Sequence, residues 1–241
     1  MYEKWKGVHT RCAFNMIQEL IPLTRPRTLA AALGPTILGA AFSYYAFGAA
    51  QGTGLAILHT VLIFLAVVTA QIVANLWNEY KDFKSGLDAG QKVGNAGSIT
   101  RGVITPELII TMIKVLMFVP IIIGLYLSAT ITWYYIPVGF LCILISFLYS
   151  GGPKPISRTP FGEISSGIAM GFAIVLITGY AWIRELSLAL LIPAIPSTLL
   201  VGSIMLTNNI RDIRNDESHG RHTLPIVLGR ERALSLMSIS Y

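Results

Sequence analysis

Six apolar segments, each close to the length of a membrane-spanning helix, constrain the fold of this chain more than any other feature. A helix needs about 20 apolar residues to cross the hydrocarbon region of a bilayer. Of the 241 residues, 54% are hydrophobic and only 12% are charged, which exceeds what a soluble core would hide. We therefore predict an all-α, polytopic transmembrane helical bundle. The six predicted spans are residues 28–49, 55–74, 108–129, 133–150, 164–183 and 186–206.

The ends of the chain add two expectations. Residues 1–26 are polar or amphipathic and lack the apolar run and small-residue site of a cleavable signal peptide. Residues 232–241 have the pattern of a seventh span that begins but is not completed. We therefore predict a single transmembrane domain over residues 1–241, with six complete spans, the start of a seventh, and a truncated C-terminal end.

Lysine and arginine are concentrated on alternate connections between the predicted spans. The N-terminal segment and the connections after the second, fourth and sixth spans hold nearly all of them, whereas the opposite connections hold only Arg184. The positive-inside rule then places the basic loops in the cytoplasm, with the protein in the inner or plasma membrane. Anionic lipid headgroups account for the net charge of +6, and no motif predicts a nucleic-acid partner.

A polar, acidic segment follows the second predicted span. If the helix continues beyond the membrane surface, Asn75, Asn78, Glu79 and Asp82 share one face, at positions i, i+3, i+4 and i+7. A glycine would then end the helix, and Asp88 could fold back toward the same place. Carboxylate and amide oxygens are ligands that Mg²⁺ prefers, with phosphate oxygens and waters completing its coordination. We predict Mg²⁺ ligands at Asn78, Glu79, Asp82 and Asp88.

A similar cluster follows the sixth span, which gives the chain a weak internal symmetry. Asp212 and Asp216 are one turn apart, and Asn208 lies one turn before Asp212. Either cluster alone fits a solvated membrane edge, but two clusters on one side, after equivalent spans, favour a common site for a polyanion. Asp212 and Asp216 join the predicted metal ligands.

Basic loops on the same side would help to bind a diphosphate that Mg²⁺ neutralises in part. Arg101, Lys154 and Arg211 are the predicted anion contacts. Aromatic side chains such as Tyr149 fit a packed core, an interfacial belt or the wall of a polyisoprenoid tunnel. The full set of basic candidates is Lys92, Arg101, Lys154, Arg158, Arg211 and Arg221.

Five motifs, in order along almost the whole chain, resemble those of the UbiA superfamily of intramembrane prenyltransferases. Within that superfamily they are most similar to the branch that prenylates 1,4-dihydroxy-2-naphthoate in menaquinone biosynthesis. The resemblance implies a nine-helix bundle with aspartate-rich motifs on helices two and six, which bind a polyprenyl diphosphate through Mg²⁺. The motifs are residues 25–29 (RPRTL), 75–88 (NLWNEYKDFKSGLD), 99–106 (ITRGVITP), 149–155 (YSGGPKP) and 208–229 (NNIRDIRND to GRHTLPIVLG).

The resemblance also implies roles for individual residues. Glu79 stands where many members have aspartate, which keeps the charge but lengthens the side chain. Lys154 lies near the basic residue that follows the glycine turn. The implied catalytic residues are Asn78, Asp82, Asp212 and Asp216, and the implied substrate contacts are Arg101, Tyr149, Lys154, Asn208, Asn209 and Arg211.

The chemistry predicted from these charges is prenyl transfer. Mg²⁺ and cationic loops would stabilise the departing diphosphate, and the dry bundle would shield the allylic carbocation until an aromatic carbon attacks it. With dihydroxynaphthoate as the acceptor, carbon dioxide is lost and demethylmenaquinone forms. Other acceptors, such as a hydroxybenzoate, chlorophyllide or glycerophosphate, stay open. A transporter or lipid-phosphate binding protein is a further alternative, although transporters place polar sites near the bilayer midplane. A third alternative is a catalytically inactive fragment that acts through assembly with other subunits.

Overall fold

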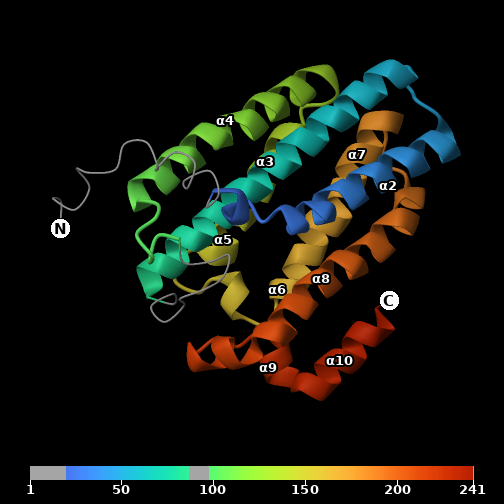
Figure 1. Cartoon of the computed structure of the whole chain (residues 1–241). Helices are drawn as coiled ribbons and strands as arrows, with labels where there is room; N and C mark the ends of the chain where they lie inside the picture. The colour runs from blue at the N-terminus through green and yellow to red at the C-terminus, as the bar shows by residue number, and fades with distance from the viewer. Residues whose placement is uncertain (1–19, 87–97, 241) are drawn as a thin grey trace.

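The computed structural model describes residues 20–86 and 98–240, and every regular element in these ranges is helical (Figure 1). The prediction of an all-α fold is confirmed. The long helices are α2 (Ala30–Phe47), α3 (Thr53–Ser85), α4 (Pro106–Thr130), α5 (Tyr135–Ser150), α7 (Ala173–Ile183) and α8 (Leu191–Ser218). The shorter elements are η2 (Pro26–Leu29), η3 (Ile156–Arg158), α6 (Gly162–Ser166), the π-helical η4 (Gly167–Phe172), η5 (Leu188–Leu190), α9 (Leu224–Leu228) and α10 (Arg230–Ile239).

Five helical segments among the described residues are long and apolar enough to cross a membrane. They are α2, α3, α4, the continuous run from α6 to α7, and the run from η5 to α8. The fourth predicted span corresponds to α5, whose 16 residues extend about 24 Å, less than the roughly 30 Å of the hydrocarbon region. A count of six spans therefore stays a prediction. Residues 232–239 of the expected start of a seventh span lie in α10 (Arg230–Ile239).

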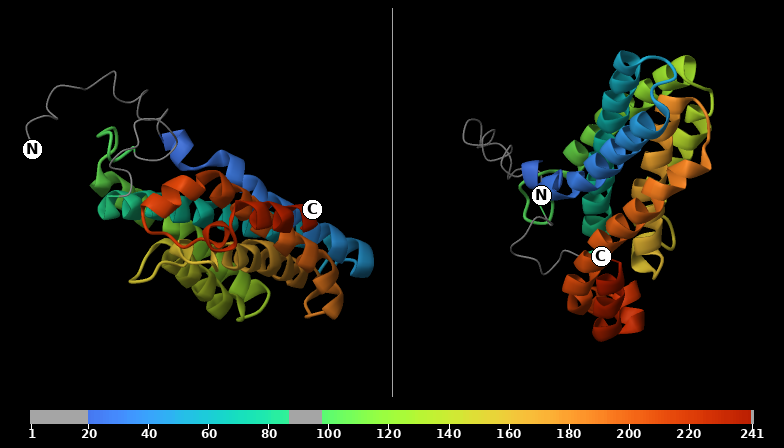
Figure 2. Two further views of the ribbon diagram at one scale, coloured as in Figure 1. Left: turned by 90° about the horizontal axis from the view of Figure 1, so that it is seen from below. Right: turned by 90° about the vertical axis from the view of Figure 1, so that its right-hand side faces the viewer.

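The long helices alternate in direction, so their connections gather at two ends of the bundle. Figures 1 and 2 show α3 and α4 side by side, and α8 running back past α7. We call the end where α3 and α8 finish the site end, and the other the far end. At the far end Arg184 donates to the backbone carbonyls of Thr130 and Ile131, at 2.8 and 3.0 Å, and to the side chain of Gln51. Three connections are thereby joined by one guanidinium group.

Glycines bring α6 and η4 against α8. A Cβ atom on Gly167 would lie 2.7 Å from the carbonyl oxygen of Thr198, and one on Gly171 would lie 2.6 Å from that of Ser197. Such small-xxx-small spacing lets backbones approach closely in membrane helix pairs. The contact fixes the position of α6, and with it the side chain of Glu163, relative to the end of α8.

Candidate functional site

Two long helices project from the bundle at the site end, each with its own termination signal. At 33 residues α3 extends about 50 Å, well beyond the hydrocarbon thickness. It ends at Gly86, which takes the left-handed conformation (φ 73°) common after helix C-termini. At the end of α8, Ser218 Oγ donates to the carbonyl oxygen of Asn215 at 2.8 Å, and His219 Nδ1 lies 2.7 Å from that oxygen. Both helices thus carry their polar residues past the apolar region, as the sequence predicts.

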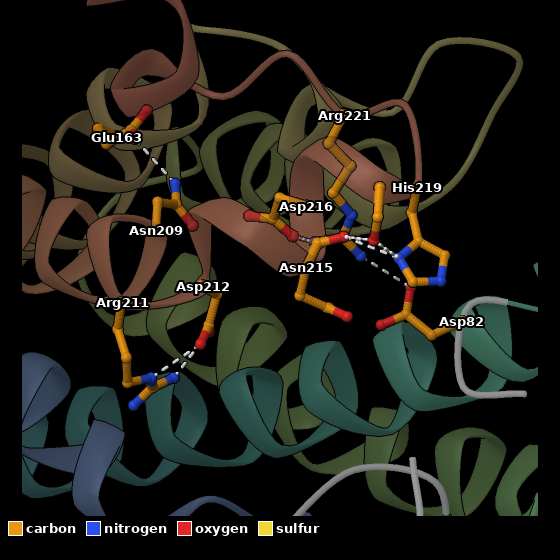
Figure 3. Close-up of polar contacts among 10 residues, drawn as sticks. Asp82, Glu163, Asn209, Arg211, Asp212, Asn215, Asp216, His219 and Arg221 are labelled. Carbon is orange, nitrogen blue, oxygen red and sulfur yellow. Dashed lines mark hydrogen bonds and ion pairs between the residues drawn. The ribbon is translucent and has the colours of Figure 1, made fainter. Parts of the chain in front are cut away.

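One arginine joins the two acidic clusters (Figure 3). Arg221 Nη2 lies 3.3 Å from Asp82 Oδ1, and Arg221 Nη1 lies 3.2 Å from Asp216 Oδ1. The exposed fractions of the side chains are 14% for Asp82, 4% for Asp216 and 16% for Arg221. Removing one member of such a buried charged group leaves the others uncompensated, which is strongly destabilising. The structure therefore brings one carboxylate from α3 and one from α8 to a single cation.

The other aspartate of the second cluster is arranged differently. Asp212 receives two hydrogen bonds from its neighbour Arg211, at 2.9 Å from Nε and 2.8 Å from Nη2. The side chains are 45% and 69% exposed, and pairs this exposed contribute little to stability. Figure 3 shows this pair apart from the group around Arg221. Asp212 therefore pairs with Arg211 at the surface, close to the buried group around Arg221.

A third carboxylate, on α6, lies beside α8 at a level further from the end of that helix. Glu163, in the first turn of α6, is buried, and its Oε1 accepts a 2.8 Å hydrogen bond from Asn209 Nδ2. Its Oε2 has no hydrogen-bond partner within the described residues. Asn209 precedes Asp216 by seven residues, so it lies on the same face of α8, about 10 Å further from the helix end. The Tyr149 hydroxyl also lies beside α6, at 3.5 Å from where a Cβ of Gly162 would be.

The side chains on the predicted polar face of α3 contact several different partners. Asn75 Nδ2 donates to the carbonyl oxygen of Thr24 at 3.1 Å. Glu79 is buried, and its Oε1 accepts the backbone N–H of Ser98 at 2.7 Å. Arg101 Nη2 in turn donates to Ser98 Oγ at 3.2 Å. Glu79 therefore anchors the connection before α4, and with it Arg101, whereas Asp82, one turn further, points to Arg221.

The remaining predicted residues are more peripheral. Asn78 and Asn208 are partly buried on α3 and α8. Lys154 is exposed and lines an open groove of about 500 Å³ between the end of α5 and α6, together with Phe161 and Ile164. Asp88, like the candidate Lys92, lies outside the described residues.

The donors at the site end suit a hard cation that shares its coordination with a substrate. Across residues 20–86 and 98–240, no three histidine, cysteine or acidic side chains gather closely enough to hold a metal ion by themselves. Mg²⁺, however, usually takes one or two protein carboxylates and completes its coordination with phosphate oxygens and waters. Asp82 and Asp216, which already share one cation, supply that number of carboxylates. These residues fit Mg²⁺ bound together with a diphosphate.

Two residues of this arrangement are not among the preferred site residues predicted from the sequence. Glu163 is a lone acid directly before an apolar segment, and that position was the only available signal. Arg221 is one of the six basic candidates in the sequence, but the predicted anion contacts are Arg101, Lys154 and Arg211. No spacing relates Arg221 to Asp82, 139 residues earlier, so only the folded chain shows their contact.

Comparisons with known proteins identify similar sequences and a similar fold. A sequence profile described as the UbiA prenyltransferase family matches residues 32–241. The chain is 38% identical to the 1,4-dihydroxy-2-naphthoate octaprenyltransferase of Bacillus subtilis, over 94% of this chain and 71% of that protein. It is 31% identical to the Mycobacterium tuberculosis protein of the same name, over 88% of this chain and 70% of that protein. A UbiA homologue from Archaeoglobus fulgidus, solved with DMAPP and Mg²⁺, superposes with a TM-score of 0.69 at 16% identity, covering 92% of this chain and 73% of that one.

Proposed function

The chain belongs to the UbiA prenyltransferase family, and we propose that it transfers a polyprenyl group from polyprenyl diphosphate to 1,4-dihydroxy-2-naphthoate with the help of Mg²⁺. The observation that carries the proposal is the meeting of Asp82 from α3 and Asp216 from α8 at one buried cation. The relatives named as 1,4-dihydroxy-2-naphthoate octaprenyltransferases support the choice of acceptor.

Asp82 and Asp216 would hold Mg²⁺, and Asn78, Asp212 and Asp88 are further candidate ligands. Glu79 is the least suited, because its carboxylate already binds the backbone of Ser98. When bound, Mg²⁺ supplies positive charge that neutralises the diphosphate and stabilises it as a leaving group.

The residues of this chain would bind, orient and shield the substrates. Arg221, together with Arg211, Lys154 and Arg101, would supply cations to a diphosphate at the site end. The allylic C–O bond breaks, and its electron pair leaves with the diphosphate. The helices below keep water from the resulting allylic cation. The aromatic carbon that bears the carboxylate then forms the new C–C bond. Loss of carbon dioxide returns the electrons of the broken C–C bond to the ring, which gives a prenylated naphthohydroquinone, the reduced form of demethylmenaquinone.

The same proposal includes the setting of the reaction. The site end would face the cytoplasm in the inner or plasma membrane, because the basic loops flank it. The isoprenoid tail would extend from the diphosphate between the apolar helices toward lipid. The position of the carboxylates at helix ends, rather than near the middle of α3 and α8, argues against a transporter.

The test is a transfer assay with the full chain in lipid nanodiscs. Radiolabelled polyprenyl diphosphate is incubated with dihydroxynaphthoate, a hydroxybenzoate or glycerophosphate, with Mg²⁺, Ca²⁺ or excess EDTA. We expect transfer to dihydroxynaphthoate with Mg²⁺, a lower rate with Ca²⁺, which prefers more ligands and longer bonds, and none with EDTA. Undiminished transfer in excess chelator would refute the metal-dependent mechanism. Preference for another acceptor would refute the assigned substrate.

A further inference from the structure

We propose that Arg221 is an exchangeable counter-ion. It holds the carboxylates of Asp82 and Asp216 together before substrate binds, and it turns to the diphosphate when a divalent cation takes its place. The inference rests on the proposed function, because it assumes that a metal–diphosphate complex binds at these carboxylates. It adds a positioning role for a residue that the two acidic motifs do not contain.

The contacts of Arg221 are those of a cation stretched between two anions. Each carboxylate receives one terminal nitrogen, at 3.3 Å for Asp82 and 3.2 Å for Asp216. Charge-assisted hydrogen bonds are usually 2.7–2.9 Å long, and arginine binds a carboxylate best through two parallel bonds. Arg211 makes such a bidentate pair with Asp212, at 2.8 and 2.9 Å. Arg221 Nε, by contrast, is buried without a partner in the described part of the chain. Neither carboxylate is therefore held in the geometry that binds arginine most tightly.

The backbone beneath this side chain is anchored on both sides. The N–H of Arg221 donates to the carbonyl oxygen of Asp216 at 3.0 Å, and the N–H of His222 donates to that of Arg158 at 3.0 Å. The next residue, Thr223, is fully buried. Gly220, with φ of 67°, provides the reversal that brings Arg221 back over the end of α8. Exchange thus needs only rotation about side-chain bonds.

The burial of these groups sets the direction of the exchange. The side chains of Asp82 and Asp216 are at least 86% covered, so removing the positive charge between them is unfavourable. A divalent ion supplies twice the charge of a guanidinium group and has a geometry suited to carboxylate oxygens. Once displaced, Arg221 keeps five N–H donors beside a site that holds a diphosphate. Arg221 should therefore compete with the metal in the free protein and assist the diphosphate in the complex.

This dual role predicts opposite effects of one substitution on two ligands. Arg221→Gln removes the charge but keeps a polar side chain. We expect Mg²⁺ to bind the substrate-free variant at least about tenfold more tightly than the wild type. With Mg²⁺ saturating, a non-cleavable thiolodiphosphate analogue of the prenyl substrate should bind about tenfold more weakly, since one charged contact is lost. A residue that merely supported the fold would not move the two affinities in opposite directions.

The measurements are equilibrium titrations of the full chain in nanodiscs, with Mg²⁺ or its probe Mn²⁺, and then with the thiolodiphosphate. Thermal unfolding with and without Mg²⁺ is a third readout, in which the ion should raise the melting temperature more in the variant than in the wild type. Arg214→Gln is the matched control, because Arg214 is an exposed arginine on α8, only seven residues before Arg221. It should leave all three readouts unchanged.

Arg221→Lys provides a second test if the glutamine variant does not insert. Lysine keeps the charge but places it on one nitrogen instead of the two that Arg221 uses, so both shifts should keep their sign and be smaller. Weaker binding of both ligands, or no change in either, would overturn the proposal. No acceptor or turnover is needed, so a failure here is distinct from a failure to transfer a prenyl group.

Discussion

Replacing Asp216 with asparagine should separate the buried carboxylate from the ordinary charges of this surface. The substitution keeps the volume and a hydrogen-bonding oxygen but removes one negative charge at a side chain that is 4% exposed. Because water barely reaches this group, solvent screening offsets little of the loss. Removing one preorganised electrostatic group from a water-excluded site typically lowers turnover about 10²- to 10³-fold, or about 3–4 kcal/mol. We expect kcat/KM for prenyl transfer to fall at least about a hundredfold.

The assay is steady-state transfer from polyprenyl diphosphate in nanodiscs, with thermal unfolding to verify that the variant is folded. Glu217→Gln is the control, since Glu217 is the next residue, exposed and about 100° around the helix. It should stay within about threefold of the wild type. Asp82→Asn, on the other side of Arg221, should match Asp216→Asn. Near-wild-type transfer by a folded Asp216→Asn, or an equal loss in Glu217→Gln, would refute the assignment of this carboxylate to the site.

Two further predictions concern packing and orientation. Gly171→Ala should lower the free energy of unfolding by about 1–3 kcal/mol, because its Cβ would lie 2.6 Å from backbone atoms of α8. Gly124→Ala is the control, since a Cβ there meets nothing within 4 Å and should not destabilise the protein. Thermal unfolding compares the two variants. Equal melting temperatures would contradict the close helix contact. A cysteine at Ser85 should react with an impermeant reagent from the cytoplasm, and one at Gly52 from the opposite side. The reverse labelling pattern would overturn the proposed orientation.

The helices that carry the site follow closely from the sequence. The apolar segments are long enough to identify α3 and α8, and the i, i+3, i+4, i+7 spacing from Asn75 to Asp82 predicts that α3 continues past the apolar region, which it does to Ser85. The glycine after it ends the helix as expected. These features depend on local interactions and on the hydrocarbon thickness, both of which a sequence displays.

The partners of the polar side chains do not follow from the sequence, because they depend on which loop reaches each helix face. Glu79 shares a face with Asp82 by spacing, yet it binds the backbone of Ser98, nearly 20 residues later. Asp212 and Asp216 are one turn apart, yet one is half-exposed and the other buried against Arg221. Periodicity predicts a common face, but a helix turn of about 5.4 Å is enough to give neighbours on that face different surroundings.

The positions of the two polar groups along α8 suggest how charge and carbocation are kept apart. Asn209, with its bond to Glu163, is the nineteenth residue of α8, about 28 Å from its start and so close to the roughly 30 Å thickness of the hydrocarbon region. Asp216 lies about 10 Å further, among the charged side chains that would hold a diphosphate and its counter-ions. A substrate bound at Asp82, Asp216 and Arg221 with its tail directed inward would place its allylic carbon closer to the apolar part of the bundle than its diphosphate. The leaving group could then be neutralised by the polar layer while the reacting carbon stays in the dry one, which is the separation that ionisation of an allylic diphosphate requires.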